Sequence, residues 1–270
     1  MKRKVKSIII LLVGIFYMMP VFLIFMNAFK PNSEIMLSFL SLPRSLYLEN
    51  FKEAMKEMHF LTALRNTLII TVGTVALSVS TSFMAAYGIS HLKNKLSDFF
   101  YLFFILGQLI PFHVVMVYIS VLSTQLHMNN TLWGIVVIKG GLNAAFGVMT
   151  YTGFLKSVPK ELEEAAAIDG CGPFQIMVRI VFPLVRTTTV TIGVLFFLWA
   201  WNEFLLPSIL IGEASLRTLT VNLNMFKSST NTEWNLLIAG LTLTILPIIM
   251  IYIAAQKYIT SGLMAGAVKS

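Results

Sequence analysis

One short polar segment, 157–170, carries the residues of this chain that are best suited to chemistry with another molecule. Its carboxylates are Glu161, Glu163, Glu164 and Asp169. Carboxylates accept short, charge-assisted hydrogen bonds from lysine and arginine. An acidic segment of this kind is suited to docking against a basic protein surface.

Local signals predict that this segment is a helix. Ser157 is a suitable N-cap, and Pro159 fits the first turn, where its missing N–H is not needed. The alanines 165–167 favour a helix and, being small, allow another surface to approach closely. Gly170 supplies the left-handed residue that ends a helix.

A second short helix is expected over 173–182, ended by Pro183. Its apolar stripe is Phe174, Met177, Ile180 and Val181. Two short helices joined at a glycine would form a rigid knob. The alternative is an amphipathic loop on the membrane surface, which the several acids disfavour because the inner leaflet is itself negative.

A second group of polar residues lies inside apolar segments. A polar side chain is costly to place inside a membrane, so each of these residues is expected to have a structural or functional role. The group consists of Gln108, Lys139, Asn143, Asn202 and Glu203. One interpretation is a polar pathway or gate for a hydroxyl-rich solute. The other is hydrogen bonding between helices. Lys139, near a segment end, could also extend its ammonium group outward to the interface.

The sequence lacks the residues that several classes of function require. No His, Cys, Asp or Glu cluster has metal-ligand spacing, so no metal site is expected. No catalytic group of residues gathers at one depth, so an enzyme is not expected. The phosphate-binding pattern G-x-x-x-x-G-K-[ST] does not occur, so the chain is not expected to hydrolyse ATP by itself.

The composition places these residues in a membrane protein. Of the 270 residues, 57% are hydrophobic and 12% are charged, whereas a soluble domain carries about 25% charged residues. The net charge is +8, and the lysines and arginines cluster at the ends of apolar runs, as membrane topology requires. They form no basic face that would bind nucleic acid.

Six apolar segments are long enough to span a bilayer, and each must be a helix to satisfy its own backbone. They are 8–29, 66–90, 99–123, 132–154, 187–211 and 236–258. With six spans, four basic regions fall on one side, which the positive-inside rule assigns to the cytoplasm. Both termini and the polar segment are therefore expected to be cytoplasmic, in a multi-pass protein of the cell membrane.

The polar segment also resembles a known motif. Glu164-Ala165-Ala166, then Gly170, Ile180 and Phe182-Pro183, is similar to the EAA loop of importer-type ABC transporter permeases. The stretch 199–204 (WAWNEF) and the glycine-rich tail 256–269 resemble the smaller permease subunit of maltose-type sugar importers. Phe182 replaces the usual leucine, and Arg186 stands where a second proline is common.

The resemblance implies an all-α integral membrane protein with the type I ABC importer permease fold. One permease domain, 1–270, would hold the six spans, a cytoplasmic coupling loop at 155–186 and a cytoplasmic tail at 259–270. The loop would dock in a cleft of an ATPase subunit. The coupling residues implied are Glu164, Ala165, Ala166, Asp169, Gly170, Ile180 and Pro183.

The resemblance implies partners as well: a second homologous permease, two ATPase subunits that bind ATP and Mg, and an extracytoplasmic solute-binding protein. Arg217, Asn222 and Asn224 would contact that binding protein. The implied function is translocation of a sugar, best an oligosaccharide, by alternating access. The alternative is a standalone secondary transporter, which needs intramembrane carboxylates, and Glu203 is its only clear candidate.

Overall fold

The computed structural model describes residues 2–92, 94–227 and 232–267, and every regular element in these ranges is a helix. Contacts divide the chain into two compact units, Met1–Arg65 with Arg217–Met250, and Asn66–Leu216 with Ile251–Ser270. The helix α4 (Phe60–Leu92) begins in the first unit, and α14 (Trp234–Ala267) ends in the second. Because every regular element is a helix, the prediction of an all-α protein is confirmed for the described residues.

The first unit holds α1 (Lys2–Asn27), α2 (Asn32–Leu37), α3 (Glu49–Glu57), α13 (Leu219–Leu223) and the 3-10 turn η3 (Asn224–Phe226). Buried Asn50 ties its segments together. The Asn50 amide donates to the carbonyl oxygens of Ala28, at 2.9 Å, and Lys30, at 2.8 Å, and accepts from Asn235 at 2.9 Å. These bonds satisfy backbone groups exposed where α1 ends.

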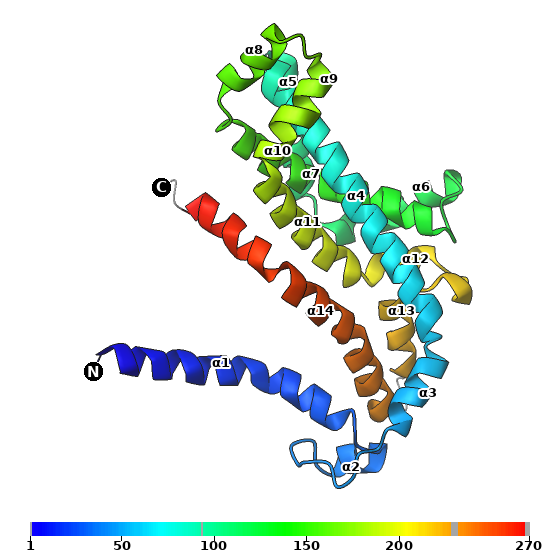
Figure 1. The fold of residues 1–270 in the computed structure, drawn as a ribbon. Helices are drawn as coiled ribbons and strands as arrows, with labels where there is room; N and C mark the ends of the chain where they lie inside the picture. Colours follow the sequence, from blue (N-terminus) through cyan, green and yellow to red (C-terminus); the bar gives the residue numbers. More distant parts are fainter. Residues whose placement is uncertain (1, 93, 228–231, 268–270) are drawn as a thin grey trace. The chain divides into compact units, whose positions relative to one another are not determined.

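The second unit contains the remaining helices. They are α5 (Lys95–Leu109), α6 (Phe112–Gln125), α7 (Leu132–Leu155), α8 (Lys160–Ile168), α9 (Pro173–Gln175), the π-helical turn η1 (Ile176–Val181), α10 (Phe182–Leu184), α11 (Arg186–Trp201), α12 (Leu205–Leu210) and the 3-10 turn η2 (Ala214–Leu216). Helix α7 packs along α5 and closely against α4. A Cβ on Gly147 would lie 2.1 Å from the Ser82 hydroxyl, so only glycine permits this approach. Figure 1 shows α5, α8 and α9 gathered at one end of this unit.

In the described part of the chain, four helices are long and apolar enough to cross a membrane: Lys6–Asn27, Phe60–Leu92, Leu132–Leu155 and Trp234–Ile253. They correspond to the predicted spans 8–29, 66–90, 132–154 and 236–258. The count rises to six if each of two sharply bent helix pairs is one span. The predicted number of spans therefore depends on these two breaks.

The third predicted span, 99–123, is not one straight helix. Helices α5 and α6 meet at a bend of 104°. Pro111 precedes α6 and has no N–H to continue the ladder, and Ile110 before it is extended at φ −79° and ψ 116°. A residue before proline avoids the helical conformation, which explains the break.

The fifth predicted span, 187–211, is also not one continuous helix. Helix α11 ends at Trp201 after 16 residues, and α12 follows only at Leu205. Before it, Pro173–Leu184 and α11 form a pair bent by 79°. Arg186 is the first residue of α11, a position that needs no intrahelical N–H bond, so its replacement of proline leaves the helix start intact.

Candidate functional site

The first helix of the polar segment is α8, and its start differs from the prediction. Pro159, in an extended conformation, is the N-cap. The Ser157 hydroxyl instead donates to the carbonyl oxygen of Phe154 at 2.7 Å, within the last turn before the loop. The expectation of a Ser157 cap was therefore wrong, because its side chain is already engaged by α7. Acidic residues still occupy the first turn, where they complement the helix dipole.

The predicted glycine stop is confirmed. Gly170 has φ +86°, which an L side chain rarely adopts. Its N–H donates to the Ala167 carbonyl, and the Cys171 N–H donates to the Ala166 carbonyl, both at 3.0 Å. These two bonds make a Schellman motif, which satisfies the last carbonyls of α8 and fixes the direction of the chain leaving it.

The second helix is longer than expected. It runs from Pro173 to Leu184 through the π-helical turn η1, and Pro183 lies inside it rather than at its end. The Phe182 N–H bonds Met177, five residues back. The wider π turn moves the preceding carbonyls away from the proline ring, which would clash with a carbonyl of an ordinary α-helix.

The three consecutive alanines of α8 face different directions, since successive residues on a helix turn by about 100°. Ala166 is 8% exposed and belongs to the core that includes Ile176 and Val181. Glu164 and Ala165 are exposed. Of the two alanines expected to enter a partner's cleft, Ala166 is therefore packed inside this chain, and only Ala165 faces outward.

The remaining predicted coupling residues divide in the same way. Asp169, Gly170 and Pro183 are exposed, and Ile180 is half-buried against the core. Two apolar side chains are strongly exposed beside them, Ile168 at 87% and Phe174 at 69%. The segment therefore presents one outward face that combines acids with apolar groups, while its inner face joins the core.

Glu163 has a contact that the sequence did not reveal. Its Oε2 accepts a hydrogen bond from the Tyr87 hydroxyl at 3.0 Å and pairs with His91 Nε2 at 2.8 Å. Both partners lie in the last turns of α4, so Glu163 ties α8 directly to a membrane span. Sequence reasoning grouped Glu163 with its neighbours as a dipole-complementing acid, since 72 positions separate it from His91.

We expect Glu163→Ala to destabilise the purified chain by about 1–3 kcal/mol, because the half-buried Tyr87 hydroxyl loses its charged acceptor. The measurement is denaturant unfolding in detergent. Glu161→Ala is the matched control, because Glu161 is exposed on the same helix. Equal stabilities of the two variants would contradict the anchoring role.

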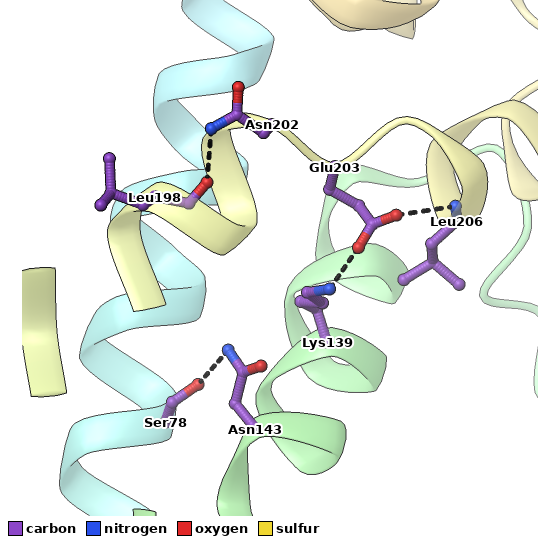
Figure 2. A network of polar contacts seen from close by, with 7 residues as sticks. All are labelled: Ser78, Lys139, Asn143, Leu198, Asn202, Glu203 and Leu206. Carbon is purple, nitrogen blue, oxygen red and sulfur yellow. Dashed lines mark hydrogen bonds and ion pairs between the residues drawn. The ribbon is translucent and has the colours of Figure 1, made fainter. Parts of the chain in front are cut away.

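The polar residues inside the spans form two interhelical contacts (Figure 2). Lys139 of α7 forms an ion pair with Glu203, which lies in the break between α11 and α12. The other oxygen of Glu203, Oε1, accepts from the N–H of Leu206 at 3.3 Å, at the start of α12. Lys139 therefore does not extend toward an interface, and both charged side chains are largely buried, at 16% and 14% exposed.

Asn143, one turn along α7 from Lys139, donates to the Ser78 hydroxyl of α4 at 3.4 Å (Figure 2). Asn202 donates to the carbonyl of Leu198 in its own helix at 2.9 Å. Gln108 is exposed near the end of α5, and its side chain makes no hydrogen bond to the described residues. The structure thus brings together Lys139 and Glu203, leaves Gln108 apart, and shows hydrogen bonding between helices at Asn143.

The three residues predicted to contact a binding protein lie in the first unit or at its edge. Asn224 is exposed and Arg217 half-buried. Asn222 is 5% exposed, and its amide donates to the Met58 carbonyl at 2.8 Å. Asn222 therefore does not face outward as predicted, because the amide is needed inside the fold. The side chains of the predicted cytoplasmic tail, 259–270, lie outside those that the structure describes.

Comparison with known proteins gives a family and close relatives. The family model described as binding-protein-dependent transport system inner membrane component matches residues 78–264. The chain is 39% identical to the probable starch degradation products transport system permease protein AmyC of Thermoanaerobacterium thermosulfurigenes, over 96% of this chain and 94% of the relative. It is 31% identical to the diacetylchitobiose uptake system permease protein DasC of Streptomyces coelicolor, over 97% and 94%.

A solved structure has the same fold. It is the crystal structure of a bacterial ABC transporter involved in the import of the acidic polysaccharide alginate, with a TM-score of 0.82 over 95% of this chain and 96% of the matched chain. The sequence identity is 22%, so this likeness bears on the fold. The type I permease architecture expected from the sequence is therefore confirmed.

Proposed function

Because the chain belongs to the family of binding-protein-dependent transport system inner membrane components, we propose that it is the permease subunit of an ABC importer for an oligosaccharide. The family is one of transport components, so the chain moves a solute and does no covalent chemistry on it. The relatives whose names include starch degradation products and diacetylchitobiose support an oligosaccharide as the substrate.

The observation that carries the proposal is the two-faced coupling segment 159–184. Its outer face offers Glu164, Ala165 and Ile168 to a partner. Its inner face is fixed to the spans by Ala166 in the core and by the Glu163 contacts with α4. A force on the outer face would therefore move the helices as a packed body, since close-packed interiors transmit strain.

We infer that the force comes from two ATPase subunits, which would bind ATP and Mg and close together when ATP is bound. The sequence of this chain has no phosphate-binding loop for that purpose. A second, homologous permease would complete the pathway, and an extracytoplasmic solute-binding protein would deliver the sugar. The coupling segment and both termini would lie in the cytoplasm, on the side of the basic clusters.

The Lys139–Glu203 pair bears on the alternative of a secondary transporter. Such a transporter needs an intramembrane carboxylate available to a coupling ion. Glu203 was the only clear candidate, and its charge is neutralised by Lys139. The pair suits a structural or gating role at the α11–α12 break better than an ion site.

The test is reconstitution of the co-purified complex in liposomes. We expect ATP hydrolysis to rise several-fold when an oligosaccharide and its binding protein are added, and sugar uptake to require ATP. Liposomes holding this chain alone should take up no sugar above the leak. Accumulation of solute by the chain alone would contradict the proposal and favour secondary transport.

A further inference from the structure

Asn130, in the loop before α7, holds a turn that lies 82 residues further along the chain. This 212–215 turn follows α12. The Asn130 side-chain oxygen accepts from the N–H groups of Gly212, at 2.7 Å, and Glu213, at 3.1 Å. The Asn130 N–H donates to the carbonyl of Leu210, the last residue of α12, at 2.9 Å. One asparagine therefore fixes three backbone groups at the start of the turn, all within the second unit.

The other end of the turn is fixed as well. The amide of Asn66, in α4, donates to the carbonyl of Ser215 at 2.9 Å. The Ser215 hydroxyl donates to the Glu213 carboxylate at 2.6 Å. The flanking residues Ile211 and Leu216 pack in an apolar core with residues of α4, α7 and α12. Residues 212 to 215 are nevertheless all exposed, so the turn is a surface feature with a preset shape.

The residue type at position 130 suits this task. Asn130 has φ +53°, a conformation that asparagine tolerates better than most side chains. An amide oxygen has two lone pairs, so a single atom can accept both N–H groups of the turn. The next residue, Thr131, caps α7 by accepting from the Gly134 N–H at 3.0 Å. The turn is therefore attached to the first residues of α7.

The turn lies at the opposite end of α7 from the coupling segment. Helix α7 is continuous over 24 residues and long enough to cross a membrane. Its last turns pack in the core that contains Ala166 of the coupling segment. Figure 1 shows α12 away from α8 and α9 in the second unit. With the coupling segment in the cytoplasm, as proposed above, the turn faces the extracytoplasmic side.

We propose that the 212–215 turn is a contact for the sugar-loaded solute-binding protein, and that Asn130 positions the turn for it. This role rests on the proposed function, which supplies that partner. A rigid surface loses little conformational freedom on binding, which favours a protein contact. Lipid is a poor occupant, because the turn has an exposed carboxylate, Glu213, and no large apolar side chain. Asn222, which the sequence assigned to this contact, is buried instead.

The test compares Asn130→Gly with the wild type. Glycine keeps the positive φ and removes the side-chain oxygen, so it loosens the turn without straining the loop. The measurement is ATP hydrolysis by the co-purified complex in liposomes, at increasing concentrations of its sugar-loaded binding protein. We expect the half-saturating concentration to rise about tenfold at a nearly unchanged maximal rate, because two hydrogen bonds that hold the docking surface are lost.

Asn130→Asp keeps an oxygen that accepts both N–H groups and should restore the half-saturating concentration. A purely structural defect would lower the maximal rate instead. Asn129→Ala is the matched control and should change neither value, because the Asn129 amide bonds Thr124 within its own loop. Ala214→Arg, on the exposed face of the turn, should raise the half-saturating concentration even if Asn130→Gly does not fold.

A wild-type half-saturating concentration in Asn130→Gly or in Ala214→Arg would overturn the proposed contact. So would an equal rise in Asn129→Ala, or a failure of Asn130→Asp to restore the wild-type value. If no sugar-loaded binding protein stimulates the wild-type complex, the proposed function itself is wrong and the contact has no partner.

Discussion

Glu164→Lys is expected to abolish sugar uptake while the chain remains inserted and folded. Glu164 is exposed on α8, and no interaction ties its carboxylate to the rest of the described chain. Reversing the charge at this position should therefore change the stability of the fold little. In the proposed complex the carboxylate meets a basic ATPase surface, where disrupting a buried charge pair costs about 2–5 kcal/mol, or roughly 30- to 5,000-fold in affinity.

The measurement is uptake into liposomes together with co-purification of the ATPase subunits. Glu161→Lys, on the same helix, is the matched control and should keep most of the uptake. Gly170→Pro tests the same segment independently: proline fixes φ near −65°, against the observed +86°, and removes the N–H that caps α8. Normal uptake by both Glu164→Lys and Gly170→Pro would refute the coupling role.

Lys139→Met is expected to destabilise the protein by about 3–5 kcal/mol, because it leaves the Glu203 carboxylate 14% exposed and without its positive partner. The double variant Lys139→Met with Glu203→Gln removes both charges and should recover most of that loss. Glu203→Gln alone leaves a buried ammonium group unpaired and should also be destabilised. Denaturant unfolding in detergent gives the four free energies of this cycle.

The cycle also separates the two roles considered for the pair. If Lys139 and Glu203 only hold α7 to the α11–α12 break, the double variant should transport at close to the wild-type rate once it is stable. If the pair opens during transport, the stable double variant should still be slow or should leak solute. Additive effects of the two single variants on stability would show that the residues do not interact.

The sequence by itself determined the class of the protein and the local form of its coupling segment. Long apolar runs between basic clusters require membrane helices, whatever their neighbours are, because the backbone must satisfy itself in lipid. Gly170 was predictable for a similar reason: a helix end needs a residue that adopts positive φ, and this preference is local. The family resemblance rested on this segment together with the stretch 199–204 and the tail 256–269.

The tertiary structure decided which residues face one another. Alanines 165–167 are alike in sequence, and only packing against Ile176 and Val181 selects Ala166 as the buried one. Glu163 finds His91 72 residues away, and Lys139 finds Glu203 64 residues away. Asn222 turns inward because Met58 offers it a carbonyl. Such pairings depend on how each helix is rotated about its axis, which is set by its packing neighbours rather than by its own residues.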